Sequence, residues 1–110
     1  MASTNKMLGQ AVATTSPVSI YNPGASTESV IKQITVCNTS TNIVTVSIYR
    51  DDDGTTYDTT TAVNYQQSVP AKSTVHFDVY YCMNDSSGNI AIEAGASSSL
   101  TITLDGIEFT

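Results

Sequence analysis

Apolar residues alternate with polar ones along most of the chain, and this period of two constrains the fold more than any other feature. Residues 43–50 show it most clearly, because Val44, Val46 and Ile48 would face one way and the residues between them the other. Successive side chains of a strand point to opposite faces, so the pattern predicts strands with one buried and one solvated face. The period of 3.6 residues that an amphipathic helix requires is sustained nowhere.

Seven segments share this alternation and are separated by turn sequences rich in Gly, Pro, Asn, Asp and Ser. They cover residues 17–21, 30–38, 43–50, 63–69, 75–81, 90–94 and 100–109. The sequence 38–42, Asn-Thr-Ser-Thr-Asn, predicts a hairpin loop. The series predicts one all-β domain, an antiparallel β-sandwich or jelly roll of seven or eight short strands.

The core should consist of the inward-facing apolar residues of these segments. We expect Val30 on the same face as Ile34 and Val36, and we expect Gly106 to mark a bulge after which Ile107 and Phe109 resume the alternation out of phase. The predicted core residues are Ile34, Val36, Val44, Val46, Ile48, Val75, Phe77, Val79, Ile92, Leu100, Ile102 and Leu104.

Both cysteines fall on the side of their strands that faces away from this core. The N-terminal residues have no pattern of a secretory signal, so folding in a reducing compartment is expected. We therefore favour two free thiols at Cys37 and Cys82 over one disulfide.

The first fifteen residues do not follow the alternation. Met7 and Leu8 form a small apolar pair flanked by Lys6 and Gly9-Gln10, and we expect the segment to be too short and too polar for a stable helix. We predict that residues 1–15 form an extended arm outside a sandwich domain of residues 16–110. The candidate contact residues of this arm are Met7, Leu8, Gly9 and Gln10.

The charge of the chain argues against two classes of partner. The net charge is -6, and the four basic residues, Lys6, Lys32, Arg50 and Lys72, are scattered along the sequence. Nucleic acids and anionic membrane surfaces both require clustered positive charge, so we expect neither as a partner. No segment is apolar and long enough to predict a membrane-spanning helix.

The sequence contains no recognisable catalytic or cofactor-binding pattern. It has no nucleophile elbow and no phosphate-binding glycine loop, and His76, the single histidine, has no predicted second metal ligand near it. Tyr80-Tyr81 could offer a sugar-binding platform, but alternation would place one ring inside and one outside. We therefore expect no enzymatic activity and no cofactor.

An acidic run, Asp51-Asp52-Asp53-Gly54, is the most conspicuous polar feature. An EF-hand loop aligned on its glycine would begin at Tyr49, which cannot serve as the first calcium ligand, so this motif is absent. Another oxygen-lined calcium site, with Asp58 as a further ligand, stays open as an alternative to a solvated loop.

Five short motifs resemble small all-β virion structural proteins of tailed bacteriophages. They are Leu8-Gly9-Gln10, Tyr21-Asn22-Pro23-Gly24, the strand and turn from Ile34 to Ser40, Glu93-Ala94-Gly95 and Gly106-Ile107-Glu108. The resemblance implies a capsid decoration (cement) protein, made in the host cytoplasm and bound on the capsid surface. Its partners would be the major capsid protein or other virion subunits. The resemblance also implies that the arm binds a neighbouring subunit, with Met7 and Leu8 filling a groove and Gly9 allowing close backbone approach.

Three alternatives stay open beside this interpretation. The chain could be a tail, neck or host-adhesion component of the virion, a secreted carbohydrate- or calcium-binding β-module, or, least favoured, an enzyme. In every case we expect a homo-oligomer, a dimer or trimer, because a small sandwich exposes edge strands and this one has few charges to guard them.

Overall fold

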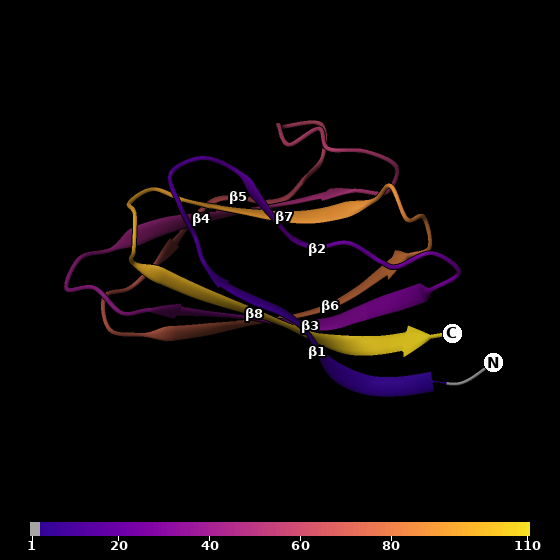
Figure 1. Ribbon diagram of the computed structural model, residues 1–110. Helices are drawn as coiled ribbons and strands as arrows, with labels where there is room; N and C mark the ends of the chain where they lie inside the picture. Colours follow the sequence, from indigo (N-terminus) through magenta and orange to yellow (C-terminus); the bar gives the residue numbers. More distant parts are fainter. Residues whose placement is uncertain (1–2) are drawn as a thin grey trace.

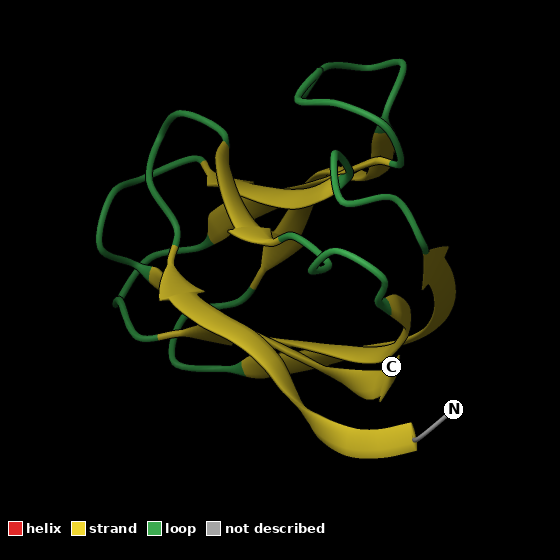
Figure 2. Ribbon diagram, turned by 45° about the vertical axis from the view of Figure 1, so that its right-hand side comes forward, coloured by secondary structure: helices red, strands yellow, loops and turns green. Residues whose placement is uncertain are grey.

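The computed structural model of the protein describes residues 3–110 and consists of two antiparallel four-stranded sheets packed face to face (Figure 1). The described chain is all strand and loop, with no helix (Figure 2), which confirms the predicted all-β class. The eight strands are β1 (Ser3–Val12), β2 (Val18–Tyr21), β3 (Glu28–Asn38), β4 (Val44–Asp51), β5 (Ala62–Val69), β6 (Thr74–Met83), β7 (Asn89–Ala94) and β8 (Leu100–Phe109).

The strand order is that of a jelly roll. The first sheet has the order β1-β8-β3-β6 and the second β2-β7-β4-β5, so β4 and β5 are the only consecutive strands that share a sheet. Every other connection carries the chain from one sheet to the other. Eight antiparallel strands wound in this way between two sheets form a jelly roll, as the alternation pattern predicted.

The predicted hairpin at residues 38–42 is wrong, because β3 and β4 lie in different sheets. The loop instead crosses between the sheets, and the side chain of Asn38 holds it in place. The Asn38 amide donates hydrogen bonds to the carbonyl oxygens of Val69 (3.0 Å) and Asn42 (2.9 Å). Its own side-chain oxygen accepts from the backbone N–H of Ser40 (2.9 Å). The buried Asn38 side chain thus supplies hydrogen-bond partners to the backbone of the loop that crosses between the sheets.

The core lies between the two sheets, and nine of the predicted core residues are buried there: Ile34, Val36, Val44, Val46, Ile48, Ile92, Leu100, Ile102 and Leu104. Val75, Phe77 and Val79 pack against this core but are half-buried, because β6 is an edge strand. The core also contains Ile31, Val69, Met83 and Ile90, which are fully buried. Each fully buried aliphatic side chain contributes roughly 1.5–3 kcal/mol.

Two β-bulges change which residues face the core near the chain termini. β3 carries an extra residue at Lys32, opposite the Asp105–Gly106 step of β8, and β1 carries one at Leu8, opposite the Leu104–Asp105 step. The bulge at Lys32 reverses the phase of β3, so Ile31 is buried and Val30 faces outward, contrary to expectation. The strand β8 itself continues in phase through Gly106, so Ile107 and Phe109 also lie on the outer face, not in the core. An added Cβ at Gly106 would meet the Val30 carbonyl oxygen at 2.1 Å.

The predicted boundary between an arm and a sandwich is also wrong for the described residues. β1 pairs with β8 from Ser3 opposite Phe109 to Val12 opposite Thr101. Immediately after it, Ala13 is buried and donates its N–H to the Leu100 carbonyl oxygen (2.9 Å). The segment is therefore the first strand of the jelly roll. Met1 and Ala2 lie outside the described residues.

Both cysteines are free, as predicted. Cys37 is half-buried opposite Thr74, and Cys82 is exposed opposite Val30, so they occupy opposite ends of the β3–β6 ladder. Their separation along the ladder rules out a bond without rearrangement of the sheet.

We expect a chain beginning at Ser16 to be strongly destabilised. It would lose the β1–β8 pairing and the packing of Leu8, Ala11 and Ala13 against the core. The loss should be about 3–6 kcal/mol by hydrophobic burial and hydrogen bonding, a large part of the stability of a small domain. Circular dichroism should show unfolding at 25 °C or a fall in Tm of roughly 15 °C or more. A Tm within a few degrees of the full chain would contradict the integral role of β1.

Candidate functional site

The structure does not present the four predicted contact residues as one free segment. Met7 lies opposite Asp105 on the outer face of the first sheet and is 54% exposed. Leu8 packs against the core from the bulge. An added Cβ on Gly9 would lie 2.6 Å from the carbonyl oxygen of Ile20, so the close approach expected at this glycine occurs within the chain, against β2. The Gln10 amide donates to Thr103 Oγ1 (2.9 Å). Met7 alone among the four offers a large exposed apolar side chain.

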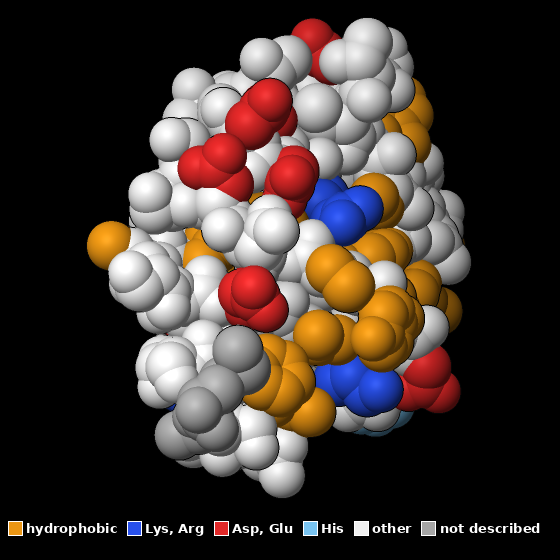
Figure 3. Space-filling model, turned by 90° about the vertical axis from the view of Figure 1, so that its right-hand side faces the viewer, with side chains coloured by type: hydrophobic (Ala, Val, Ile, Leu, Met, Phe, Trp, Pro, Cys, Tyr) orange, Lys and Arg blue, Asp and Glu red, His pale blue; other side chains and the backbone are white. Residues whose placement is uncertain are grey.

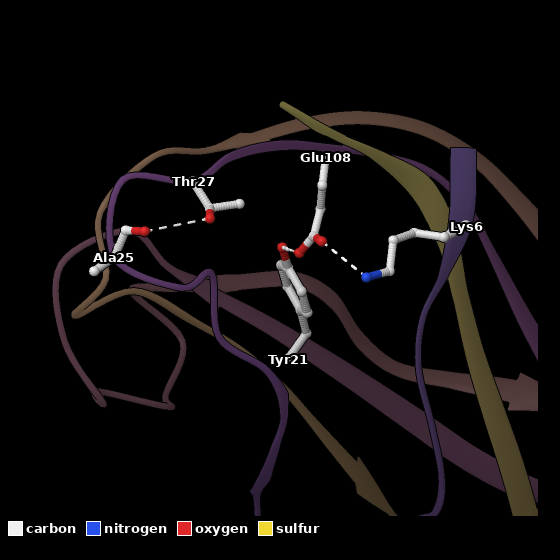
Figure 4. Close-up of polar contacts among 5 residues, drawn as sticks. All are labelled: Lys6, Tyr21, Ala25, Thr27 and Glu108. Atoms are coloured by element: carbon white, nitrogen blue, oxygen red, sulfur yellow. Dashed lines mark hydrogen bonds and ion pairs between the residues drawn. The ribbon is translucent and has the colours of Figure 1, made fainter. Parts of the chain in front are cut away.

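Both ends of the described chain lie at one end of the sandwich, where a polar cluster joins the two sheets (Figures 1 and 4). The hydroxyl of Tyr21, on β2, donates to Glu108 Oε2 (2.7 Å), and the Lys6 ammonium, on β1, lies 3.0 Å from Glu108 Oε1. Glu108 on β8 therefore links its neighbouring strand to the opposite sheet. The contact between Lys6 and Glu108 is the single ion pair within residues 3–110.

The cluster changes the acidity of two of its members. Burial, together with the nearby Glu108 carboxylate, raises the pKa of Tyr21 to about 12. The Tyr21 hydroxyl and then the Lys6 ammonium hold the pKa of Glu108 below its ordinary value of 4.5. Both shifts favour the neutral phenol donating to an ionised carboxylate.

An apolar patch covers the outer face of the first sheet at this same end. Ile107 lies opposite Val30, which lies opposite Cys82, so the three form a row across β8, β3 and β6. Phe109 extends the patch along β8, and Tyr80 extends it along β6 with 68% of its surface exposed. Figure 3 shows hydrophobic side chains gathered on this end of the molecule, beside a group of acidic side chains.

A groove of about 440 Å³ opens at the margin of this patch. Val30, Tyr80 and Phe109 supply apolar walls, and Glu28, Arg50 and Asp52 supply charged ones. Arg50 is the penultimate residue of β4 and reaches across to β6, where its Nη2 donates to the Cys82 carbonyl oxygen (2.7 Å). The guanidinium carbon also lies 5.5 Å from the centre of the Tyr81 ring. Arg50 thereby links β4 of the second sheet to β6, an edge strand of the first sheet, and closes one side of the groove.

The acidic run is organised by its own loop. Asp51 is buried and accepts hydrogen bonds from the backbone N–H groups of Thr56 (2.8 Å) and Asp53 (3.2 Å), which lower its pKa. The hydrogen bond and negative charge of Asp51 raise the pKa of Asp53. Asp58 accepts from the backbone N–H and hydroxyl of Thr60. Within residues 3–110 no group of three or more His, Cys, Asp or Glu side chains is placed to hold a metal ion, so the geometry gives the calcium alternative no support.

The other residues considered as chemical candidates lie apart. His76 is exposed on β6, with its Nδ1 3.1 Å from Thr35 Oγ1. Tyr80 faces outward and Tyr81 is half-buried, as alternation predicted. No helix among the described residues is of the length and apolarity needed to traverse a bilayer.

Several residues of this end were not identified from the sequence. Tyr21, Arg50 and Glu108 have no local signature, because each acts on a residue distant in sequence. The apolar patch did carry a signal, since Ile107 and Phe109 stand in phase with Thr101, Thr103 and Asp105. Strict alternation along β8 would have placed both on the outer face.

The comparisons with known proteins show the fold alone. The sequence matches no protein-family model, and no curated protein is significantly similar to it. A chain of the T13 particle of infectious bursal disease virus superposes with a TM-score of 0.59 and 11% identity, covering 97% of this chain and 30% of that one. A chain of the Gx strain of the same virus gives a TM-score of 0.53 and 12% identity, with coverages of 97% and 32%. This chain therefore spans about a third of the viral chains that it resembles.

We expect Glu108→Gln to lower stability at neutral pH by about 0.5–1.5 kcal/mol, since it removes the ion pair with Lys6 and weakens the bond from Tyr21. A carboxylate whose pKa is lowered by folding stabilises the fold above its unfolded pKa, here near 4.5, and this contribution is lost as the pH falls further. Urea unfolding at pH 7, 5 and 3 should therefore show a difference in the free energy of unfolding between variant and parent, and this difference should narrow toward pH 3.

The matched control for this series is Glu28→Gln. Glu28 is an exposed carboxylate without an ion-pair partner in residues 3–110, so its variant should stay within about 0.5 kcal/mol of the parent. A pH-independent gap for Glu108→Gln would show that packing, not charge, explains its effect.

Proposed function

We propose that this protein is a virion structural protein, and specifically a capsid decoration protein bound to the outer surface of a bacteriophage head. The observation that carries the proposal is that nearly the whole chain is one jelly roll, and that chains from virus particles share this fold over 97% of its length. Jelly rolls recur in viral capsid and lectin domains. The proposal also rests on the short motifs that resemble small virion proteins of tailed bacteriophages.

The architecture suits a structural task better than a catalytic one. Strands and short connections make up most of the residues described, and the polar cluster at Glu108 joins strands to one another instead of pointing into a cleft. A compact module of 110 residues can attach to a shell that other subunits have already formed. Synthesis in the host cytoplasm and location on the capsid surface are part of the same proposal.

The outer face of the first sheet is the proposed attachment face for the major capsid protein or another virion subunit. It presents Met7 on β1 and the apolar patch of Val30, Ile107 and Phe109 on the same side of one sheet. Exposed apolar area of this kind marks interaction surfaces. The first sheet also ends in two open edges, β1 and β6, and pairing through such edges would produce the proposed dimer or trimer.

The test is the copy number of this chain in purified virions. Quantitative mass spectrometry should find it at a ratio to the major capsid protein near one to one or one to a few, as a decoration protein requires. A dozen or fewer copies per particle would instead assign it to the tail, neck or adhesion apparatus. Absence from washed particles would overturn the virion role altogether.

We expect Met7→Asp to lower the occupancy of the particle without unfolding the domain. Met7 is exposed on the proposed attachment face, so a carboxylate there would be desolvated on binding at a cost of about 1–3 kcal/mol, or roughly tenfold or more in affinity. The measurement is occupancy after rebinding to stripped particles. Val18→Asp, at a position 46% exposed on the other sheet, is the control and should bind as the parent does. Equal occupancy for both variants would place the attachment face elsewhere.

A further inference from the structure

We propose that the groove between β3, β6 and the loop after β4 binds an extended segment of a partner polypeptide that presents an apolar side chain flanked by lysine or arginine. The identification of that partner as a virion subunit rests on the proposed function, whereas the chemistry of the groove does not. The inference follows from three properties of the groove: its apolar walls, its carboxylates without ion-pair partners, and the contacts that its one cation, Arg50, makes within the protein.

The apolar walls face outward, with Tyr80 exposed and Val30 and Phe109 half-buried. Val30 and Phe109 face outward, because the bulge at Lys32 reverses β3 and because β8 continues in phase. Tyr80 is 68% exposed on the edge strand β6. With a volume of about 440 Å³, the groove lies within the range of roughly 300–1,000 Å³ typical of binding pockets. Covering these walls with an apolar side chain would remove their surface from water.

The net charge of the residues that line the groove is negative. Glu28 and Asp52 line it, both are exposed, and neither forms an ion pair within residues 3–110. The neighbouring loops add further carboxylates, since Asp53 lies close enough to Asp51, Asp52 and Asp85 for their charges to raise its pKa. A cationic residue of a partner would relieve this repulsion, and an acidic one would increase it.

The one cation of the groove, Arg50, offsets only part of this negative charge. Arg50 already donates to the Cys82 carbonyl oxygen and lies against the Tyr81 ring. Its Nε is buried and has no hydrogen-bond partner among the described residues, while the residue as a whole is half-buried and lines the groove. An acidic segment would therefore meet two carboxylates, Glu28 and Asp52, against a single guanidinium that already has contacts within the protein. The groove thus selects a basic, apolar segment.

The test uses the isolated full-length protein and two synthetic peptides, so it is independent of the virion assignment. One peptide carries Leu-Phe flanked by lysines, and the other carries Leu-Phe flanked by glutamates. Two-dimensional NMR titration of the isotope-labelled protein should show saturable shifts for the lysine peptide at residues 28–30, 80–84 and 109. The glutamate peptide should bind at least about tenfold more weakly, because the charge of each flanking residue is reversed.

Variants separate the contributions of charge and apolar surface. Glu28→Gln combined with Asp52→Asn should weaken binding of the lysine peptide by about threefold to tenfold, the range expected for two exposed ion pairs. Tyr80→Ser should weaken both peptides. Tyr65→Ser is the matched control, since Tyr65 is 52% exposed on β5 in the other sheet, and it should bind as the parent does.

Three results would overturn the proposal. The first is the absence of saturable shifts at the groove, and the second is equal binding of the two peptides. The third is a self-association that ultracentrifugation detects and that Tyr80→Ser abolishes, because a second copy of this acidic chain would then occupy the groove. Failure of any of these tests would leave the virion copy number unaffected, so the two proposals can fail separately.

Discussion

The pairing of β8 with both β1 and β3 is the interaction on which the rest of the structure depends. β8 runs between these two strands, and Leu100, Ile102 and Leu104 on its inner face are completely buried. Its far end carries Glu108, which binds Lys6 on β1 and Tyr21 on the opposite sheet. The last strand of the chain therefore holds the first one in place and closes one end of the sandwich. Because these partners are far apart in sequence, no local segment of the chain can form the pairing by itself.

The same strand produces the surface on which the functional proposals rest. Its outer positions change from threonines near Leu100 to Ile107 and Phe109 near the C-terminal end. The bulge in β3 adds Val30 beside them. The core and the proposed attachment face thus use opposite sides of one strand: the inner side fills the core, and the outer side carries the apolar patch.

Electrostatics divides this end of the molecule into two regions. Near β1 and β2 the charges are paired, with Glu108 satisfied by Lys6 and Tyr21. Near β6 and the loop after β4, the carboxylates of Glu28 and Asp52 have no ion-pair partner among the described residues. Arg50 there donates to the Cys82 carbonyl oxygen. The first region holds strands together, and the second has charge available for a ligand. This difference is why the groove, and not the Glu108 cluster, carries the inference about a partner.

The sequence by itself determined the class of fold, the inner face of most strands and the free thiols, because alternation is a local property that each strand carries alone. Val44, Val46 and Ile48 could be placed in the core without knowing their neighbours. The tertiary structure decided everything that depends on how strands are aligned. It made Ser3–Val12 a strand, because β8 offers this polar segment a partner for its backbone. It also turned Val30 outward, because the extra residue at Lys32 accommodates the register of β8, and a register exists only between strands.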